Sequence, residues 1–367
     1  MIRVGVVDDS PSIRSVLREL INQETDMRCV GSAADPYGAR EMIKVAQPDV
    51  ITLDIEMPRM NGLEFLERLM RLHPLPVIMI SSLTERGSKA ALEALSLGAV
   101  DIIEKPSLQD AEAWAQYSVR IVERIRMAAR TRVQARVPRD TPPAGALHPH
   151  GGAVQGPGLQ ALPVAGRTPG AKPQGKAFGG QDPVVLIGAS TGGTEALRAL
   201  LGSLPANFPP VLVVQHMPET FTRHFAERLD QTCQMEVREA QGDDGLQWGR
   251  VLIAPGHSHL LLAQRGGQWR CQLEASAKRN HHRPSVDVLY ESALALGKRV
   301  HAVLLTGMGR DGAQGMLALH ETGAATVCQS ERSCLVFGMP RAAIAIGAAG
   351  SVLDLEQIAP HLVKQLV

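Results

Sequence analysis

The sequence is poor in aromatic residues and contains no long apolar segment. Phe, Trp and Tyr make up only 3% of its 367 residues. The Pro- and Gly-rich stretch at about 131–182 has almost no aromatic residues to stack on nucleic-acid bases, so it does not indicate a nucleic-acid-binding arm. No apolar run approaches the roughly 20 residues that a membrane-spanning helix needs. The first residues lead directly into a predicted strand, unlike the apolar region of a signal peptide. We therefore expect a cytoplasmic protein without direct membrane insertion.

An excess of one charge and paired cysteines are also missing. The 38 Lys and Arg residues nearly balance the 37 Asp and Glu residues, for a net charge of +1. Global electrostatics therefore imply no nucleic-acid partner and no anionic membrane surface. The five cysteines include no CxxC pair and lie mostly in apolar stretches. This is typical of reduced core thiols and not of disulfides or a zinc site.

The length and the hydrophobic pattern indicate two domains. A chain of 367 residues with 44% hydrophobic content can form two cores. Residues 1–122 and 183–367 both alternate short β-branched runs with helical patterns, which predicts α/β domains with parallel sheets. Residues 123–182 contain the end of a helix and then a Pro- and Gly-rich stretch without apolar periodicity. We interpret that stretch as a flexible linker.

Five polar residues lie within two positions after the ends of four short apolar runs in the first domain. The runs are 4–7, 50–53, 77–80 and 100–103, and the residues are Asp8, Asp9, Asp54, Ser81 and Lys105. Because parallel strands end at one edge of a sheet, these side chains are expected to meet there. Crowded carboxylates beside a lysine suit Mg²⁺, and a carboxylate next to Mg²⁺ can accept a phosphoryl group. Asp54 is the candidate acceptor because it stands alone at the centre of the edge.

Each of these residues alone could simply cap a following helix. The ordered set of Asp-Asp, Asp, Ser and Lys-Pro, however, resembles the receiver domain of two-component response regulators over about residues 1–122. The resemblance implies a flavodoxin-like fold with a five-stranded parallel sheet and phosphorylation at Asp54. It also implies Mg²⁺ bound by Asp8, Asp9 and Asp54, with Ser81 and Lys105 as switch residues. Ile102 stands where an aromatic switch residue is usual, so an aromatic rotamer switch is not implied.

The second domain opens with a serine on a glycine-rich turn. The apolar run 184–187 is followed by Gly-Ala-Ser-Thr-Gly-Gly, residues 188–193. This matches the G-x-S-x-G nucleophile elbow and half-matches a dinucleotide-binding loop, and either motif alone is weak. Two later runs, 211–214 and 300–305, lead into His216 and Asp311. Ser190, His216 and Asp311 would therefore share one sheet edge, as a catalytic triad requires.

Other interpretations of these three residues fit less well. His216 could be an ordinary loop histidine, and Asp311 could cap the helix that follows it. The order Ser, His, Asp differs from the order in α/β-hydrolases. A dinucleotide-binding domain would need an acidic residue after its second strand, where this chain has Gln215 and His216. The triad is favoured because all three residue types follow strands.

The whole chain resembles the chemotaxis response regulator protein-glutamate methylesterase (CheB) family. The resemblance rests on the receiver motifs and on Gly-Ala-Ser-Thr-Gly-Gly, Gln-His-Met, Arg-Pro-Ser-Val-Asp and Thr-Gly-Met-Gly-Arg-Asp-Gly in the second domain. It implies a doubly wound α/β methylesterase domain over 183–367, with Ser190, His216 and Asp311 as its triad. Backbone N–H groups near Thr191 or Met308 are the oxyanion-hole candidates.

That resemblance also implies substrates and partners. The substrates would be glutamate methyl esters, and specific glutamines, on methyl-accepting chemotaxis receptors, and a chemotaxis histidine kinase would be the phosphodonor. No cofactor is expected in the catalytic domain. The alternative is a response regulator whose second domain is a non-catalytic protein-binding module. For five further residues in turns we expect ordinary loop packing: His257, His281, His282, Arg283 and Ser285.

Overall fold

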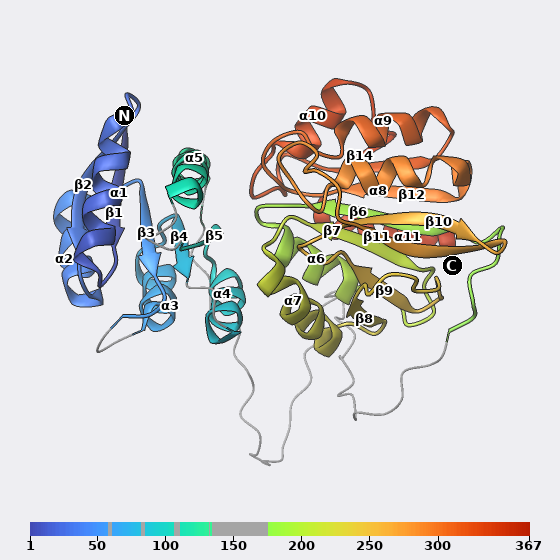
Figure 1. Ribbon diagram of the computed structural model, residues 1–367, viewed down its shortest axis with the longest axis horizontal. Helices are drawn as coiled ribbons and strands as arrows, with labels where there is room; N and C mark the ends of the chain where they lie inside the picture. Colours follow the sequence, from blue (N-terminus) through green and yellow to red (C-terminus); the bar gives the residue numbers. More distant parts are fainter. Residues whose placement is uncertain (58–60, 82–84, 106–110, 132, 134–174) are drawn as a thin grey trace, which may run out of the picture.

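The computed structural model describes residues 1–57, 61–81, 85–105, 111–131, 133 and 175–367, which form two α/β units (Figure 1). Most of the predicted linker lies outside these residues. No helix in the described ranges is long and apolar enough to cross a membrane. All five cysteines are free thiols, and burial raises the pKa of the Cys271 and Cys328 thiols. This agrees with the predicted reduced core thiols.

The first unit is a five-stranded parallel sheet covered by helices. Its elements are β1 (Ile2–Val7), α1 (Pro11–Gln23), β2 (Met27–Ala33), α2 (Pro36–Ala46), β3 (Val50–Asp54), α3 (Gly62–Leu72), β4 (Val77–Ser81), α4 (Glu85–Leu97), β5 (Asp101–Glu104) and α5 (Ala111–Ala128). The strand order is β2-β1-β3-β4-β5, and every pairing is parallel. The predicted receiver architecture is confirmed.

Local sequence explains where helices of the first unit begin. Ser10 and Asp35 are N-caps whose side chains accept backbone N–H bonds, and a proline follows each of them. Proline suits the first helical position because its missing N–H would be unpaired there anyway. These caps place α1 and α2 directly after β1 and β2, so the carboxyl ends of the strands remain at one open edge.

The second unit is built on a seven-stranded sheet. Its elements are β6 (Val184–Ala189), α6 (Gly193–Gly202), β7 (Val211–Gln215), α7 (Glu219–Thr232), β8 (Glu236–Glu239), β9 (Arg250–Ile253), β10 (His259–Arg265), β11 (Gln268–Glu274), α8 (Val286–Ser292), η1 (Leu294–Arg299), β12 (Val300–Leu304), α9 (Ala313–Glu321), β13 (Ala325–Gln329), α10 (Met339–Ala345), β14 (Ser351–Leu353) and α11 (Leu355–Leu366). The order β14-β13-β12-β6-β7-β9-β8 is parallel throughout, and β10 and β11 form a separate antiparallel pair.

Helices cover both faces of the larger sheet, as in a doubly wound fold (Figure 1). One core contains Leu197 of α6, Phe221 of α7 and Ile358 of α11, and the other contains Leu289 of α8 and Met316 of α9. The first strand, β6, lies between β7 and β12. The chain therefore adds β7, β8 and β9 on one side of β6 and later adds β12, β13 and β14 on the other side. Such a reversal creates the crevice in which open α/β sheets bind ligands.

The second unit begins before the predicted start at Pro183. The Phe178 N–H donates to the Leu246 carbonyl at 3.0 Å, and the Trp248 N–H donates to the Lys176 carbonyl at 3.0 Å. The Phe178 side chain packs against the core that contains α8 and α9. Residues 175–182 therefore belong structurally to the second unit. At the other boundary, α5 continues beyond residue 122 as far as Ala128.

Candidate active site and phosphorylation site

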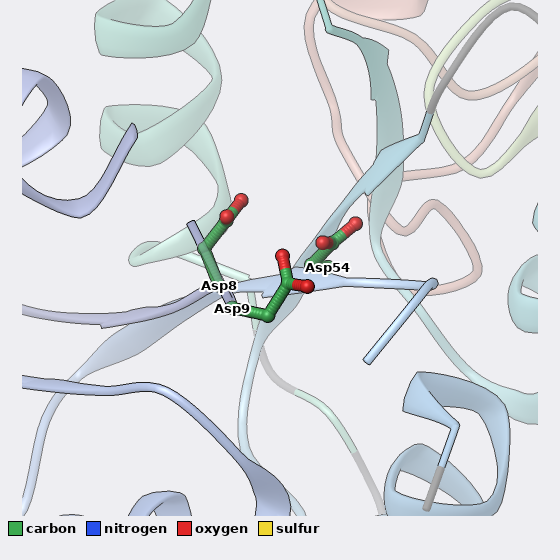
Figure 2. Close-up of side chains that lie close together, drawn as sticks. All are labelled: Asp8, Asp9 and Asp54. Atoms are coloured by element: carbon green, nitrogen blue, oxygen red, sulfur yellow. The ribbon is translucent and has the colours of Figure 1, made fainter. Parts of the chain in front are cut away.

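Three carboxylates gather at the carboxyl edge of the receiver sheet (Figure 2). Asp8 and Asp9 follow β1, Asp54 ends β3, and one oxygen of each lies within 4.8 Å of the others. Lys105 follows β5, and its Nζ lies 2.7 Å from Asp54 Oδ2 and 2.9 Å from Asp8 Oδ2. The structure thus brings together four of the five predicted residues. Ser81 ends β4, but its side chain lies outside the described part of the chain.

The electrostatics of this cluster suit a hard cation and a reactive carboxylate. Burial raises the pKa of Asp54 to about 6, and the hydrogen bond and charge of Lys105 oppose that rise. Burial acts to lower the pKa of Lys105, but its bonds to Asp54 and Asp8 raise it overall. Asp8 Oδ2 is buried, and the Lys105 ammonium lies 2.9 Å from it. A cluster of three neighbouring carboxylates fits Mg²⁺.

Ser190 occupies the turn between β6 and α6. Its N–H donates to the Thr306 carbonyl at 3.0 Å, and its carbonyl accepts from the Gly193 N–H at 2.7 Å. Gly192 closes the turn with a φ of 77°, a left-handed conformation that glycine adopts without steric cost. Ser190 is buried. A Cβ on Gly307 would lie 2.7 Å from the Ser190 Cβ, so only glycine lets the loop after β12 pack directly on the serine.

His216 and Asp311 form a buried hydrogen-bonded pair. His216 Nε2 lies 2.8 Å from Asp311 Oδ2, and their side chains are 3% and 1% exposed. Because an ionised carboxylate only accepts hydrogen bonds, we assign the imidazole proton to Nε2. Nδ1 is buried and has no partner among the described residues. His216 and Ser190 line the same pocket, so Nδ1 is the ring nitrogen left free to act as a base there.

Asp311 is held by more than the imidazole. Its carboxylate accepts from Ser285 Oγ, from Asn280 Nδ2 and from the Val286 N–H, each at 2.7 Å. Burial acts to raise the pKa of Asp311, but the hydrogen bonds from His216, Asn280 and Ser285 outweigh it and keep that pKa below its usual range. The N-cap of α9 is Gly312, without a side-chain cap. The Asp311 side chain therefore serves the start of α8 and the imidazole, and it does not cap the helix that follows it.

Part of this support has no signal in the sequence. Asn280 lies in no motif, and loop packing is the expected role of Ser285 and His282, yet Asn280 and Ser285 both bind Asp311. The His282 ring stacks on the His216 ring, with centroids 3.7 Å apart and planes 7° apart. The Arg-Pro-Ser-Val-Asp motif was the only signal for this region. Arg283 donates to the carbonyls of Ala275 and Ser276 in its own loop, as loop packing predicts.

The oxyanion-hole candidates lie beside the serine. Thr191 is the next residue in the turn, and Met308 follows Gly307, which packs on Ser190. In the described ranges, neither residue uses its backbone N–H in a hydrogen bond to the protein. Both N–H groups are therefore free to donate to a substrate oxygen.

The receiver lines one side of the pocket that contains Ser190 and His216. Receiver residues Asp101 and Ile102 line this pocket together with Thr191. Arg124 of α5 donates to Thr191 Oγ1 at 2.5 Å and ion-pairs with Asp101. Met308, Leu335 and Val336 pack against the receiver core, and α4 contacts α6 and α7. The receiver thus contacts the second unit both at the pocket and around it.

Together, these features define a response regulator receiver joined to an α/β output domain, in which Ser190 and His216 line one pocket and His216 bonds Asp311. The CheB methylesterase family model matches residues 185–362, and the response regulator receiver domain model matches residues 4–113. A protein-glutamate methylesterase/protein-glutamine glutaminase of Thiobacillus denitrificans is 48% identical over 358 residues, with 97% of this chain and 94% of the relative covered. The protein-glutamate methylesterase/protein-glutamine glutaminase 2 of Burkholderia thailandensis is 50% identical over 367 residues, with both chains fully covered. The chain belongs to the CheB methylesterase family.

Solved structures of related domains match each unit separately. The CheB methylesterase catalytic domain of Thermotoga maritima is 39% identical, with a TM-score of 0.49, and the match covers 50% of this chain and 98% of that domain. The response regulator domain of Thermotoga maritima CheB is 46% identical, with a TM-score of 0.33, and the match covers 35% of this chain and 96% of that domain.

Proposed function

We propose that the protein hydrolyses glutamate methyl esters on chemotaxis receptors and that Ser190, His216 and Asp311 are its catalytic triad. The hydrogen bond from His216 Nε2 to Asp311 carries the proposal, because it leaves Nδ1 free in the pocket that Ser190 lines. Relatives that align over the full length and are named protein-glutamate methylesterase/protein-glutamine glutaminase support this substrate class. A non-catalytic binding module has no comparable support.

The triad performs ester hydrolysis in two steps. Ser190 Oγ attacks the ester carbonyl while His216 Nδ1 takes the hydroxyl proton, and Asp311 stabilises the imidazolium through Nε2. His216 then protonates the departing methoxide, so methanol leaves and an acyl-enzyme remains. Water attacks the acyl group with His216 again as the base, which releases glutamate and restores the Ser190 hydroxyl. Glutamine would react in the same way with ammonia as the leaving group.

Backbone N–H groups would stabilise the negative charge that develops on the carbonyl oxygen. We assign this role to the N–H groups of Thr191 and Met308, which are free and flank Ser190. A single donor of this kind contributes about 2.7–4 kcal/mol of transition-state stabilisation. Since the receiver contacts both residues in the closed arrangement, it covers the oxyanion side of the site as well as the serine.

The receiver would make this activity dependent on phosphorylation. Asp54 is the proposed acceptor, with a chemotaxis histidine kinase as the donor, and Lys105 would pair with the new phosphoryl group. Asp8, Asp9 and Asp54 would hold Mg²⁺, which when bound neutralises charge on the transferring group. Ser81 is the proposed switch hydroxyl. The cytoplasmic location remains a prediction.

A physical connection links the two sites. Lys105, which contacts Asp54, directly follows β5, and the same strand carries Asp101 and Ile102 at the catalytic pocket. A change in the Asp54–Lys105 pair on phosphorylation would therefore act on the strand that contacts the second unit. The proposed division is a receiver at 1–122, a helix end and linker at 123–182 and a catalytic domain at 183–367, except that α5 extends the receiver to Ala128 and residues 175–182 pack on the catalytic unit.

The decisive experiment measures methanol release from methylated receptor membranes by the purified full chain. We expect release by the wild type, faster release in the presence of a small phosphodonor, and none from Ser190→Ala. The alanine variant should still be phosphorylated at Asp54, because the two sites lie in separate units. Methanol release by Ser190→Ala at a rate near that of the wild type would refute the triad. No release by the phosphorylated wild type would refute the proposed activity.

A further inference from the structure

A tight turn lies over the His216–Asp311 pair. Arg279 and His282 exchange backbone hydrogen bonds of 3.0 and 2.9 Å, and the residues between them, Asn280 and His281, have φ values of 52° and 68°. Two central residues with positive φ are typical of a type I′ turn. Positive φ is uncommon for residues other than glycine, although Asn and His adopt it more often than most. Contacts around the turn add to its stability.

Those contacts fasten the turn to the catalytic acid. Asn280 Nδ2 donates to Asp311 Oδ1 and to Asp287 Oδ2, both at 2.7 Å. On the other side, Arg279 makes an ion pair of 2.7 Å with Glu291 of α8. The residue that closes the turn, His282, is thereby fixed relative to Asp311.

His282 meets the flat face of His216. A centroid separation of 3.7 Å with planes 7° apart is direct ring-on-ring contact. The hydrogen bond from Nε2 to Asp311 fixes one atom of the His216 ring, but the ring could still tilt about that bond. A flat neighbour in contact with its face removes this freedom. The bond and the stack together determine where Nδ1 points.

We propose that His282 is a positioning residue, which keeps the plane of the His216 ring oriented so that Nδ1 faces Ser190 throughout the reaction. The proposal rests on the proposed function of the triad. It assigns no proton transfer to His282 itself. What the reaction requires at this position is a flat ring and not an imidazole.

The surroundings of His282 support this role. Burial lowers the pKa of His282, and the nearby His216, Arg124 and His281 lower it further, against the opposing effect of Asp311. The ring therefore stays neutral when His216 becomes an imidazolium. A neutral ring face attracts a cation, whereas a second imidazolium in contact would repel it. His282 can thus stay in place through both protonation states of His216.

Three variants of the full chain test the proposal, with a phosphodonor present and methanol release as the readout. His282→Ala removes the ring, and we expect kcat to fall about 10²-fold, the cost typical of a slightly misplaced catalytic group, with little change in KM. His282→Phe keeps a flat ring without nitrogens and should restore most of kcat. His281→Asn is the matched control, because His281 is exposed and asparagine tolerates positive φ. This control should retain wild-type kcat.

The outcomes separate the possible failures. If His282→Ala matched the wild type in kcat, the stack would have no positioning role. If His282→Phe were as slow as His282→Ala, the imidazole nitrogens would be needed and the proposal would be wrong. A rise in KM at constant kcat in His282→Ala would indicate a substrate contact instead of positioning. Failure of the wild type itself to release methanol would reject the proposed function, whatever the variants do.

Discussion

Arg124 of the receiver donates a 2.5 Å hydrogen bond to the hydroxyl of Thr191, the residue next to Ser190. Asp101 contacts both residues: it forms an ion pair with Arg124 and accepts a 3.0 Å hydrogen bond from Thr191 Oγ1. The receiver therefore covers the site and also binds the turn that carries the nucleophile. Loss of this contact should favour the open arrangement even without phosphorylation.

Arg124→Ala should activate the resting enzyme. A hydrogen bond to a charged group contributes about 1.5–3 kcal/mol, so methanol release by the unphosphorylated chain should rise about tenfold or more. Arg120→Ala is the matched control, since it removes the same charge from an exposed position of α5. Equal resting rates in the two variants would show that the Arg124–Thr191 bond does not contribute to inhibition.

Asp311→Asn should nearly abolish turnover. The asparagine amide can donate to Nε2, which would move the imidazole proton to Nδ1 and remove the base that the proposed mechanism requires. The corresponding change in a serine protease triad costs about 10⁴ in kcat, and we expect a loss of that order in steady-state methanol release. Ser285→Ala leaves the carboxylate in place and should cost far less. A loss below tenfold in Asp311→Asn would mean that Asp311 chiefly supports the start of α8.

Asp54→Asn should block phosphoryl uptake from the kinase or from a small phosphodonor, and chelation of Mg²⁺ should block it in the wild type. The measurement is incorporation of labelled phosphate into the full chain. Ser190→Ala is the control and should be labelled normally. Labelling of Asp54→Asn at the wild-type rate would place the acceptor elsewhere, and Asp9 would be the next residue to test.

Stability of the second unit should fall as the pH drops below about 6.5. Burial lowers the pKa of His282 and of His301, whereas an unfolded chain binds a proton at each histidine near its usual pKa of about 6.5. The unfolded state then binds more protons, so the free energy of unfolding decreases by at most about 1.4 kcal/mol per pH unit for each histidine. The loss begins as the pH falls through the unfolded-state pKa and stops below the folded-state pKa.

His282→Phe should remove one of these two contributions and flatten the pH dependence. Urea unfolding can be followed through the fluorescence of Trp248 and Trp269, which both lie in the second unit, in a background with Trp114→Phe. The control is the same background with His282 intact. An unchanged slope between pH 7 and 5 would show that His282 already binds a proton in the folded protein.

The sequence was sufficient to predict which residues gather at each sheet edge, because each group lies at the ends of buried strands. Strands such as β3 and β6 are β-branched runs that hydrophobic pattern identifies, and parallel strands must end together. The edge strand β2 was not identified, since only its two ends, Met27 and Ala33, are buried. The expectation that a helix ends after residue 122 agrees with α5, which ends at Ala128.

The supporting contacts could not be predicted in this way. Asn280, His282 and Ser285 reach the triad only because the chain between β11 and α8 folds into one particular turn, and no periodicity specifies that turn. The contact between the units joins residues 67 positions apart, Arg124 and Thr191. Such polar pairs depend on how two finished domains dock. The packing of residues 175–182 was hidden by the Pro- and Gly-rich composition that continues up to them.

The last prediction concerns a fragment that starts at Gly175. It contains the whole seven-stranded sheet, both of its helical layers and Phe178, so it should fold alone. A fragment that starts at Pro183 lacks the bonds and packing of residues 175–182. Complete burial of a Phe side chain is worth about 1.5–3 kcal/mol. Because Phe178 is only partly buried, the shorter fragment should lose less than that, seen as a lower melting temperature.

The longer fragment should release methanol faster than the unphosphorylated full chain, and phosphorylation of the full chain should close most of that gap. The reason is that removal of the receiver uncovers the pocket and removes the receiver's contacts with Thr191 and Met308. Weaker docking of the receiver after phosphorylation should have the same effect. A full reversal from 1:99 to 99:1 would need about 5.5 kcal/mol of differential free energy, so phosphorylation should release the site only in part. If the fragment proved no faster than the resting chain, simple exclusion would be wrong. The phosphorylated receiver would then have to activate the catalytic unit through contacts of its own.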